Sequence, residues 1–111
     1  MDRLKYREVL QSIVNRHAKF QPANGNIQTH AVCDTENGDY MVVDSGWNEK
    51  GRRIYDVVIH FRLQGDKVSV ERDNTDAEVV RELIEDGIAK DDITLAYNAV
   101  PFQHLDDLIA A

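Results

Sequence analysis

A basic and aromatic cluster occupies a predicted turn near the middle of the chain. Trp47 precedes the turn residues Asn48-Glu49-Lys50-Gly51, and Arg52 and Arg53 follow them. If the chain reverses there, Trp47 lies opposite Arg52, and a guanidinium can stack on the indole ring. Trp and Arg are enriched at protein-binding hot spots, and such clusters also hold bases and phosphates. We expect Trp47, Lys50, Arg52 and Arg53 to bind a partner, with plain hairpin surface as the alternative.

His60 and Glu71 form the best candidate acid–base pair. The turn Gly65-Asp66 closes a predicted hairpin that places His60 opposite Glu71. A carboxylate can orient an imidazole for general acid–base catalysis. The alternative is a cross-strand polar pair on a solvated sheet face.

The other reactive side chains match no motif. The four histidines, His17, His30, His60 and His104, are not at metal-ligand spacing from a cysteine or a pair of carboxylates. His17 is expected to be capped or half-buried. Cys33 has no base nearby in the sequence, and a small half-buried thiol is expected there. The sequence therefore predicts no catalytic residue, metal or cofactor.

Size and charge narrow the class of protein. The chain has 111 residues, which predicts one domain over residues 1–111 with one core. Its formal net charge is −7, whereas DNA binders neutralise phosphates with Lys and Arg, so the charge weighs against direct DNA binding. One cysteine and no long apolar segment predict a cytoplasmic protein without a membrane anchor.

The first half of the chain predicts one helix and four strands. A helix is expected from Asp2 to His17, with one apolar stripe at helical spacing formed by Tyr6, Leu10, Ile13, Val14 and His17. The expected strands are Ile27–Thr35, Tyr40–Trp47, Arg52–Gln64 and Lys67–Arg72. Asn37-Gly38 favours a two-residue hairpin loop between the first two, which would set Cys33 opposite Val42.

The third strand shows the clearest period-two alternation. Its expected core face holds Tyr55, Val57, Ile59, Phe61 and Leu63. The other face holds Ile54, Asp56, Val58, His60 and Arg62. In the fourth strand, Val68 and Val70 are expected to face the core.

The second half predicts a helix, a strand and a tail. Thr75 and Glu78 form a capping box before the second helix, and Gly87 is its expected C′ residue. A fifth strand is expected over Ile93–Tyr97 and a short helix within Pro101–Ala111. The order is therefore α+β: an N-terminal helix, a four-stranded antiparallel meander, a second helix, a final strand and a short C-terminal helix.

An ordered set of short segments resembles one family over nearly the whole length. The matching segments are Leu4-Lys5-Tyr6-Arg7, Gly46-Trp47, Arg53-Ile54-Tyr55, Val58-Ile59-His60, Lys67-Val68, Asp73-Asn74-Thr75-Asp76, Glu82-Leu83, Gly87 to Ile93 and Pro101-Phe102. On these segments the chain resembles the XisI-type proteins, the fdxN element excision controlling factors found mainly in cyanobacteria.

The resemblance implies a non-enzymatic regulatory protein in DNA recombination. It would control programmed excision of a DNA element through a protein partner, with a XisH-type nuclease-fold protein as the implied partner and a homo-oligomer as a further option. The chain departs from the family at Ser69, where an aromatic residue is usual, and over Gln103 to Asp107, where the family tail is commonly basic.

Two other functions remain open from the sequence. A small ligand-binding domain or hydrolase could use a polar sheet face around His60. Direct DNA binding could use Arg52 and Arg53, and it would weaken steeply with salt.

Overall fold

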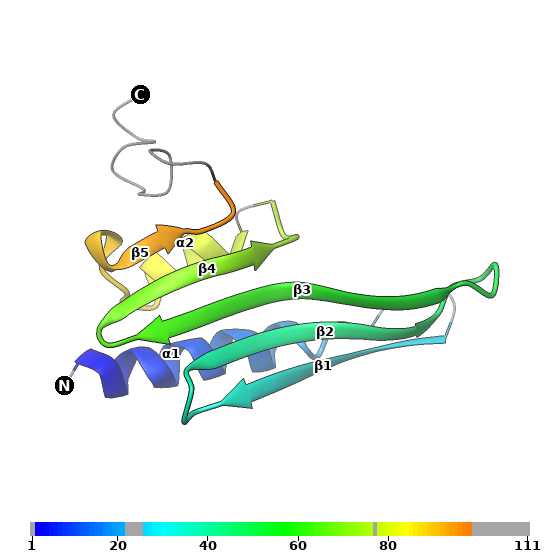
Figure 1. Cartoon of the computed structure of the whole chain (residues 1–111), viewed down its shortest axis with the longest axis horizontal. Helices are drawn as coiled ribbons and strands as arrows, with labels where there is room; N and C mark the ends of the chain where they lie inside the picture. Colours follow the sequence, from blue (N-terminus) through cyan, green and yellow to red (C-terminus); the bar gives the residue numbers. More distant parts are fainter. Residues whose placement is uncertain (1, 22–25, 77, 99–111) are drawn as a thin grey trace.

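Two helices and one five-stranded sheet make up the part of the chain that the computed structural model describes, residues 2–21, 26–76 and 78–98 (Figure 1). The elements are α1 (Asp2–His17), β1 (Asn26–Asp34), β2 (Asp39–Trp47), β3 (Arg53–Gln64), β4 (Lys67–Asp73), α2 (Glu78–Glu85), the 3₁₀ turn η1 (Lys90–Asp92) and β5 (Ile93–Leu95). The predicted α+β class and element order are confirmed. The helix expected within 101–111 lies outside the described residues.

The sheet is mixed, with strand order β1-β2-β3-β4-β5. The first four strands form the predicted antiparallel meander, and β5 runs parallel to β4. A parallel neighbour needs a crossover, which α2 and η1 supply. Both helices lie behind the sheet in Figure 1, so among the described elements one face is covered and the other is open.

The core lies between the helices and the covered face. The helical stripe is confirmed: Tyr6, Leu10, Ile13 and Val14 are buried, and His17 is half-buried. The sheet contributes Tyr40, Val42, Ile59, Phe61, Leu63, Val68, Val70, Ile93 and Leu95, and α2 contributes Val79, Val80 and Leu83.

The ends of α2 agree with the sequence in outline. Gly87 has φ 110° and donates to Ile84, while Ile88 donates to Leu83 at 2.9 Å, which makes the C-terminal turn a Schellman motif. At the other end, the Thr75 hydroxyl accepts from the N–H of Val79 at 3.1 Å, one residue later than the capping box predicts.

The loop between β1 and β2 is longer than predicted. Asp34 pairs with Asp39, so Thr35 to Gly38 form a four-residue turn, and Cys33 lies opposite Tyr40 rather than Val42. The Asp34 carboxylate explains the longer loop because it accepts from the backbone N–H groups of residues 36 and 37, both at 3.1 Å. The two-residue turn at Gly65-Asp66 is confirmed by the pair Gln64–Lys67.

A β-bulge makes the predicted core face of the third strand wrong over its first half. Val42 pairs with Ile59 but Val43 pairs with Val57, so Val58 is an extra residue in β3. An extra residue reverses the side-chain alternation on one side of the bulge. Tyr55 and Val57 therefore lie on the open face, whereas Val58 packs against the core.

No helix among the described residues is both long and apolar enough to cross a membrane.

Candidate functional site

Three side chains form an aromatic and basic cluster on the open face of the sheet. Trp47 pairs with Arg53 across β2 and β3, and Tyr55 lies two residues along from Arg53 on the same face. The Cζ atom of Arg53 lies 4.6 Å from the centre of the Trp47 ring and 5.9 Å from that of Tyr55. The predicted cation–π contact exists, but Arg53 makes it. The prediction that Arg52 lies opposite Trp47 was wrong, because the turn is one residue longer than the predicted turn of residues 48–51.

The turn that carries this cluster is held by Asn48. Its side-chain oxygen accepts from the backbone N–H groups of Lys50 at 2.9 Å and Arg52 at 3.0 Å. Gly51 adopts φ 76°, a conformation that suits glycine at the end of the turn. Lys50 and Arg52 are exposed at the tip, and this hairpin projects beyond the helices at the right of Figure 1.

The cluster is exposed and carries local positive charge on an acidic protein. Trp47 is 50% exposed and Tyr55 is 71% exposed. The Arg53 guanidinium is held in place because it also donates to the carbonyl of Gly46 at 3.3 Å. Two aromatic rings with a fixed cation between them can take an apolar group and an acidic group of a partner together.

Tyr55 is the residue that sequence reasoning missed in this cluster. Strict alternation assigned it to the core, and the bulge at Val58 turns it outward. The adjacent Val57 and Val58 are the signal, since two neighbouring apolar residues interrupt a period-two pattern.

The predicted pair of His60 and Glu71 is wrong. A second bulge makes Glu71 the extra residue of β4, and His60 pairs with Arg72. The side chain of His60 instead contacts Asp39, with 2.9 Å between Nε2 and Oδ1, and Arg62 donates to the same oxygen at 3.1 Å. The Glu71 carboxylate accepts from the Ser69 hydroxyl. His60 therefore has a carboxylate neighbour, but a different one.

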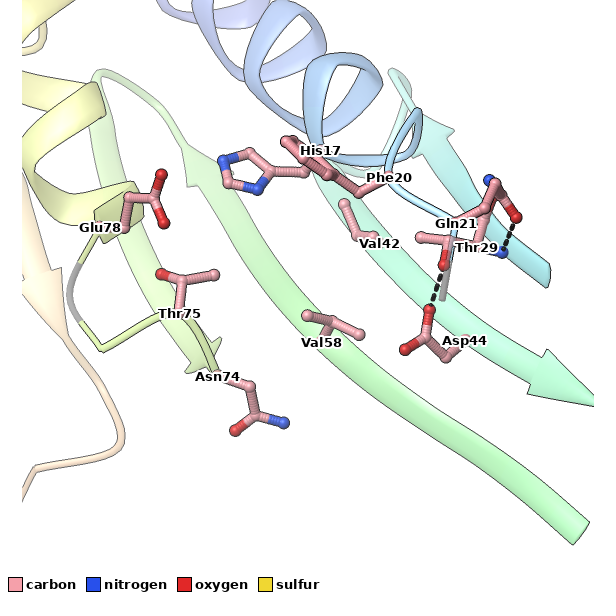
Figure 2. Close-up of a pocket in the computed structure, with 10 residues that line it drawn as sticks. All are labelled: His17, Phe20, Gln21, Thr29, Val42, Asp44, Val58, Asn74, Thr75 and Glu78. Atoms are coloured by element: carbon pink, nitrogen blue, oxygen red, sulfur yellow. Dashed lines mark hydrogen bonds between the residues drawn. The ribbon is translucent and has the colours of Figure 1, made fainter. Parts of the chain in front are cut away.

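A cavity of about 500 Å³ opens on the covered side of the sheet, between the end of α1 and the start of α2 (Figure 2). Its polar lining comes from six elements or connections, and Thr29 donates to Asp44 within it at 2.6 Å. The lining residues are His17, Phe20, Gln21, Thr29, Val42, Asp44, Val58, Asn74, Thr75 and Glu78. Neither His60 nor Glu71 lines this cavity.

His17 approaches two carboxylates of α2 at the rim of this cavity. The ligand atoms of His17, Glu78 and Glu82 lie within 4.8 Å of one another, a spacing that could hold a metal ion. Glu82 already contacts two cation-forming groups, however: Arg16 donates to Oε1 at 2.6 Å, and His17 Nε2 lies 2.6 Å from Oε2. These contacts explain the cluster without a metal, because they hold α1 against α2. Nothing in the sequence indicates this role, since His17 and Glu82 are far apart along the chain.

Comparison with known proteins identifies the family. The family model of the XisI protein matches residues 1–108. The chain belongs to the XisI family. A solved XisI-like protein from Anabaena variabilis ATCC 29413 is 27% identical, has a TM-score of 0.82 and covers 91% of this chain and 92% of its own. The fdxN element excision controlling factor XisI of the same organism is 22% identical, with a TM-score of 0.76 and 89% of each chain covered, and it shows the shared fold. No curated protein matches.

The XisI match spans both the aromatic cluster and the cavity, so family membership alone does not choose between them. The choice rests on exposure. The cavity is lined by groups that bond to one another, as Thr29 does to Asp44. The rings of Trp47 and Tyr55 instead face outward on the uncovered side of the sheet.

Proposed function

We propose that this XisI-family chain is a non-enzymatic controlling factor for programmed excision of a DNA element. It acts in the cytoplasm by binding a protein partner through Trp47, Arg53 and Tyr55, with Lys50 and Arg52 at the rim. The family and the name of one solved relative support the role in excision control. The exposed stack of Arg53 on Trp47 is the observation that carries the binding surface.

A protein fits this surface better than DNA does. The formal net charge of the chain is −7, so a polyanion is repelled by most of the molecule. Three cations, Lys50, Arg52 and Arg53, gather at one hairpin, which suits a small acidic patch on a folded partner. Trp and Arg are the side chains most enriched among interface residues whose truncation weakens binding. The XisH-type nuclease-fold protein implied by the family resemblance is the proposed partner.

The alternative function, a hydrolase or ligand-binding domain around His60, has less support. Asp39 is shared between His60 and Arg62, which is the arrangement of a cross-strand ion-pair group. Glu71 points its carboxylate at Ser69, two residues away in its own strand. This arrangement leaves His60 without the general acid–base partner that the sequence suggested.

The proposed function is tested by co-purification with the XisH-type protein. The double variant Trp47→Ala/Arg53→Ala should lose most partner recovery while its circular dichroism stays unchanged. The matched control is Phe20→Ala/Arg81→Ala, which also removes one exposed aromatic ring and one exposed guanidinium, but away from the open face. The control should recover as much partner as the unaltered chain.

Two results would overturn the proposal. Equal recovery by both double variants would show that the cluster is ordinary surface. A DNA gel shift by the chain alone that weakens steeply with salt and disappears with Arg52→Ala/Arg53→Ala would instead assign the same hairpin to nucleic acid.

A further inference from the structure

β1 forms one edge of the sheet, and within the described part of the chain its C-terminal half is open to pairing with another strand. It runs nine residues, Asn26–Asp34, and its register against β2 has no irregularity. From Asn26 to Cys33 it carries no Asp, Glu, Lys or Arg, and it has no proline. Edge strands are normally protected by charges, proline or a bulge. Cys33, expected to be half-buried, is exposed on this edge.

The side chain of Gln21 reveals which backbone groups of β1 point outward. It donates to the carbonyl of Thr29 at 3.1 Å and accepts from the N–H of Thr29 at 3.1 Å. Both groups of Thr29 therefore point away from β2, and strand alternation gives Ala31 and Cys33 the same direction. Gln21 thus occupies the edge at Thr29 as a neighbouring strand would, and Figure 2 shows the two side by side.

We propose that β1 pairs antiparallel with β1 of a second copy of this chain, about a two-fold axis at Val32. In this register Ala31 exchanges both backbone hydrogen bonds with Cys33 of the second copy, and symmetry repeats the exchange. An axis at Ala31 would need the groups of Thr29 that Gln21 occupies. An axis at Cys33 would need Thr35, which lies in the turn.

The side chains in this register are complementary. Val32 is 43% exposed in one copy and would pack against its own symmetry mate. His30 would lie opposite Asp34 of the second copy, twice, on the same face as Val32. Two chains of net charge −7 repel in most orientations, whereas this stretch of edge brings no like charges together.

Pairing through β1 would fix how two partner-binding surfaces are arranged, an inference that rests on the proposed function. The two-fold axis is perpendicular to the sheet, so both copies keep their helices on one side and their Trp47 clusters on the other. Asn26 lies opposite Trp47 and six residues from Val32, which separates the two clusters by about 40 Å along the strands. A dimer would thus present two binding surfaces to one symmetric partner.

Disulfide trapping in the full chain tests the register. In a Cys33→Ser background, Val32→Cys places two thiols in a directly opposed pair that is not hydrogen-bonded, which is close enough for a disulfide. Mild oxidation should give covalent dimer. The matched control is Gln28→Cys in the same background: it lies on the same strand and face, but its symmetry mate is about 26 Å away, so oxidation should give no covalent dimer.

Light scattering after size exclusion tests the dimer independently of the excision function. The unaltered chain should be dimeric at micromolar concentration, and Ala31→Pro should weaken association roughly tenfold to thirtyfold because two interchain hydrogen bonds are lost. Should Ala31→Pro disturb folding, Val32→Lys gives a second variant, since an exposed side chain is replaced and like charges meet at the axis. A monomer at all concentrations would overturn the proposal. So would a dimer that persists in Ala31→Pro and Val32→Lys, if Val32→Cys and Gln28→Cys also form covalent dimers to the same extent.

Discussion

Arg53 stacks on Trp47 at the exposed end of the β2–β3 hairpin, with 4.6 Å between Cζ and the ring centre. An exposed cation–π contact contributes only about 0.5–1 kcal/mol. Trp47 is 50% exposed, so a partner can still contact its ring. The pair is thus more useful for recognition than for folding.

Arg53→Ala should therefore leave the free energy of unfolding within about 1 kcal/mol of the unaltered chain. Trp47 is the only tryptophan, so its fluorescence reports on the cluster directly. Adding the partner should shift its emission to shorter wavelength and shield it from acrylamide in the unaltered chain, and much less in Arg53→Ala. Arg81→Ala is the control. A loss of several kcal/mol in urea unfolding would show that Arg53 is structural.

Gly38→Ala should cost at least about 3 kcal/mol of stability. Gly38 has φ 80°, and a Cβ there would lie 2.3 Å from the carbonyl oxygen of Leu63. Gly65→Ala is the matched control: Gly65 has φ 63° with no atom near the added Cβ, so only the conformational cost of about 1 kcal/mol applies. Urea titrations of both variants measure the difference, and equal losses would contradict the close approach of the turn to β3.

The sequence predicted which elements form but not where two strands gain a residue. The apolar stripe of α1 and Gly87 at the end of α2 depend on local spacing, and the structure confirms them. The face of Tyr55 depends on the unpaired Val58, and period two cannot decide which of two adjacent valines is extra.

The candidate sites show the same difference between features set by local sequence and features set by tertiary packing or register. Trp47 and Arg53 are joined by one turn, so the sequence found them together. His17 and Glu82 are 65 residues apart, and only the packing of the two helices brings them into contact. The pairing of His60 failed because the bulge at Glu71 shifts the register by one residue.

Tyr6→Phe should destabilise the chain by about 1–3 kcal/mol. The buried Tyr6 hydroxyl donates to Asp92 at 2.5 Å and accepts from the N–H of Ala89 at 3.2 Å, so it ties α1 to η1. Phenylalanine fills the same space but leaves the Ala89 N–H without this acceptor. Thermal unfolding followed by circular dichroism measures the loss. Tyr55→Phe, exposed on the open face, is the control and should change stability by less than about 0.5 kcal/mol.

Asp92 should make the stability of the chain depend on pH in the acid range. Hydrogen bonds from Lys67 and then from Tyr6 lower the pKa of Asp92 below its usual value. A carboxyl whose folded-state pKa is lowered stabilises the fold above its unfolded pKa, near 4, and this contribution is lost as pH falls further. Asp92→Asn should therefore be less stable than the unaltered chain at pH 6, with a gap that closes toward pH 3. A gap independent of pH would contradict the assignment.

Glu82→Gln tests whether the acidic groups of α2 tie the two helices together. Glu82 is 14% exposed at its side chain and contacts both Arg16 and His17 at 2.6 Å. Losing its charge should cost about 1–2 kcal/mol, because bonds to charged groups in a partly buried setting are stronger than exposed ones. Glu85→Gln is the control: Glu85 lies 4.0 Å from Arg81 and its side chain is 64% exposed, so the expected loss is below about 0.5 kcal/mol. Equal urea midpoints for the two variants would show that the contacts of Glu82 contribute nothing to holding α1 against α2.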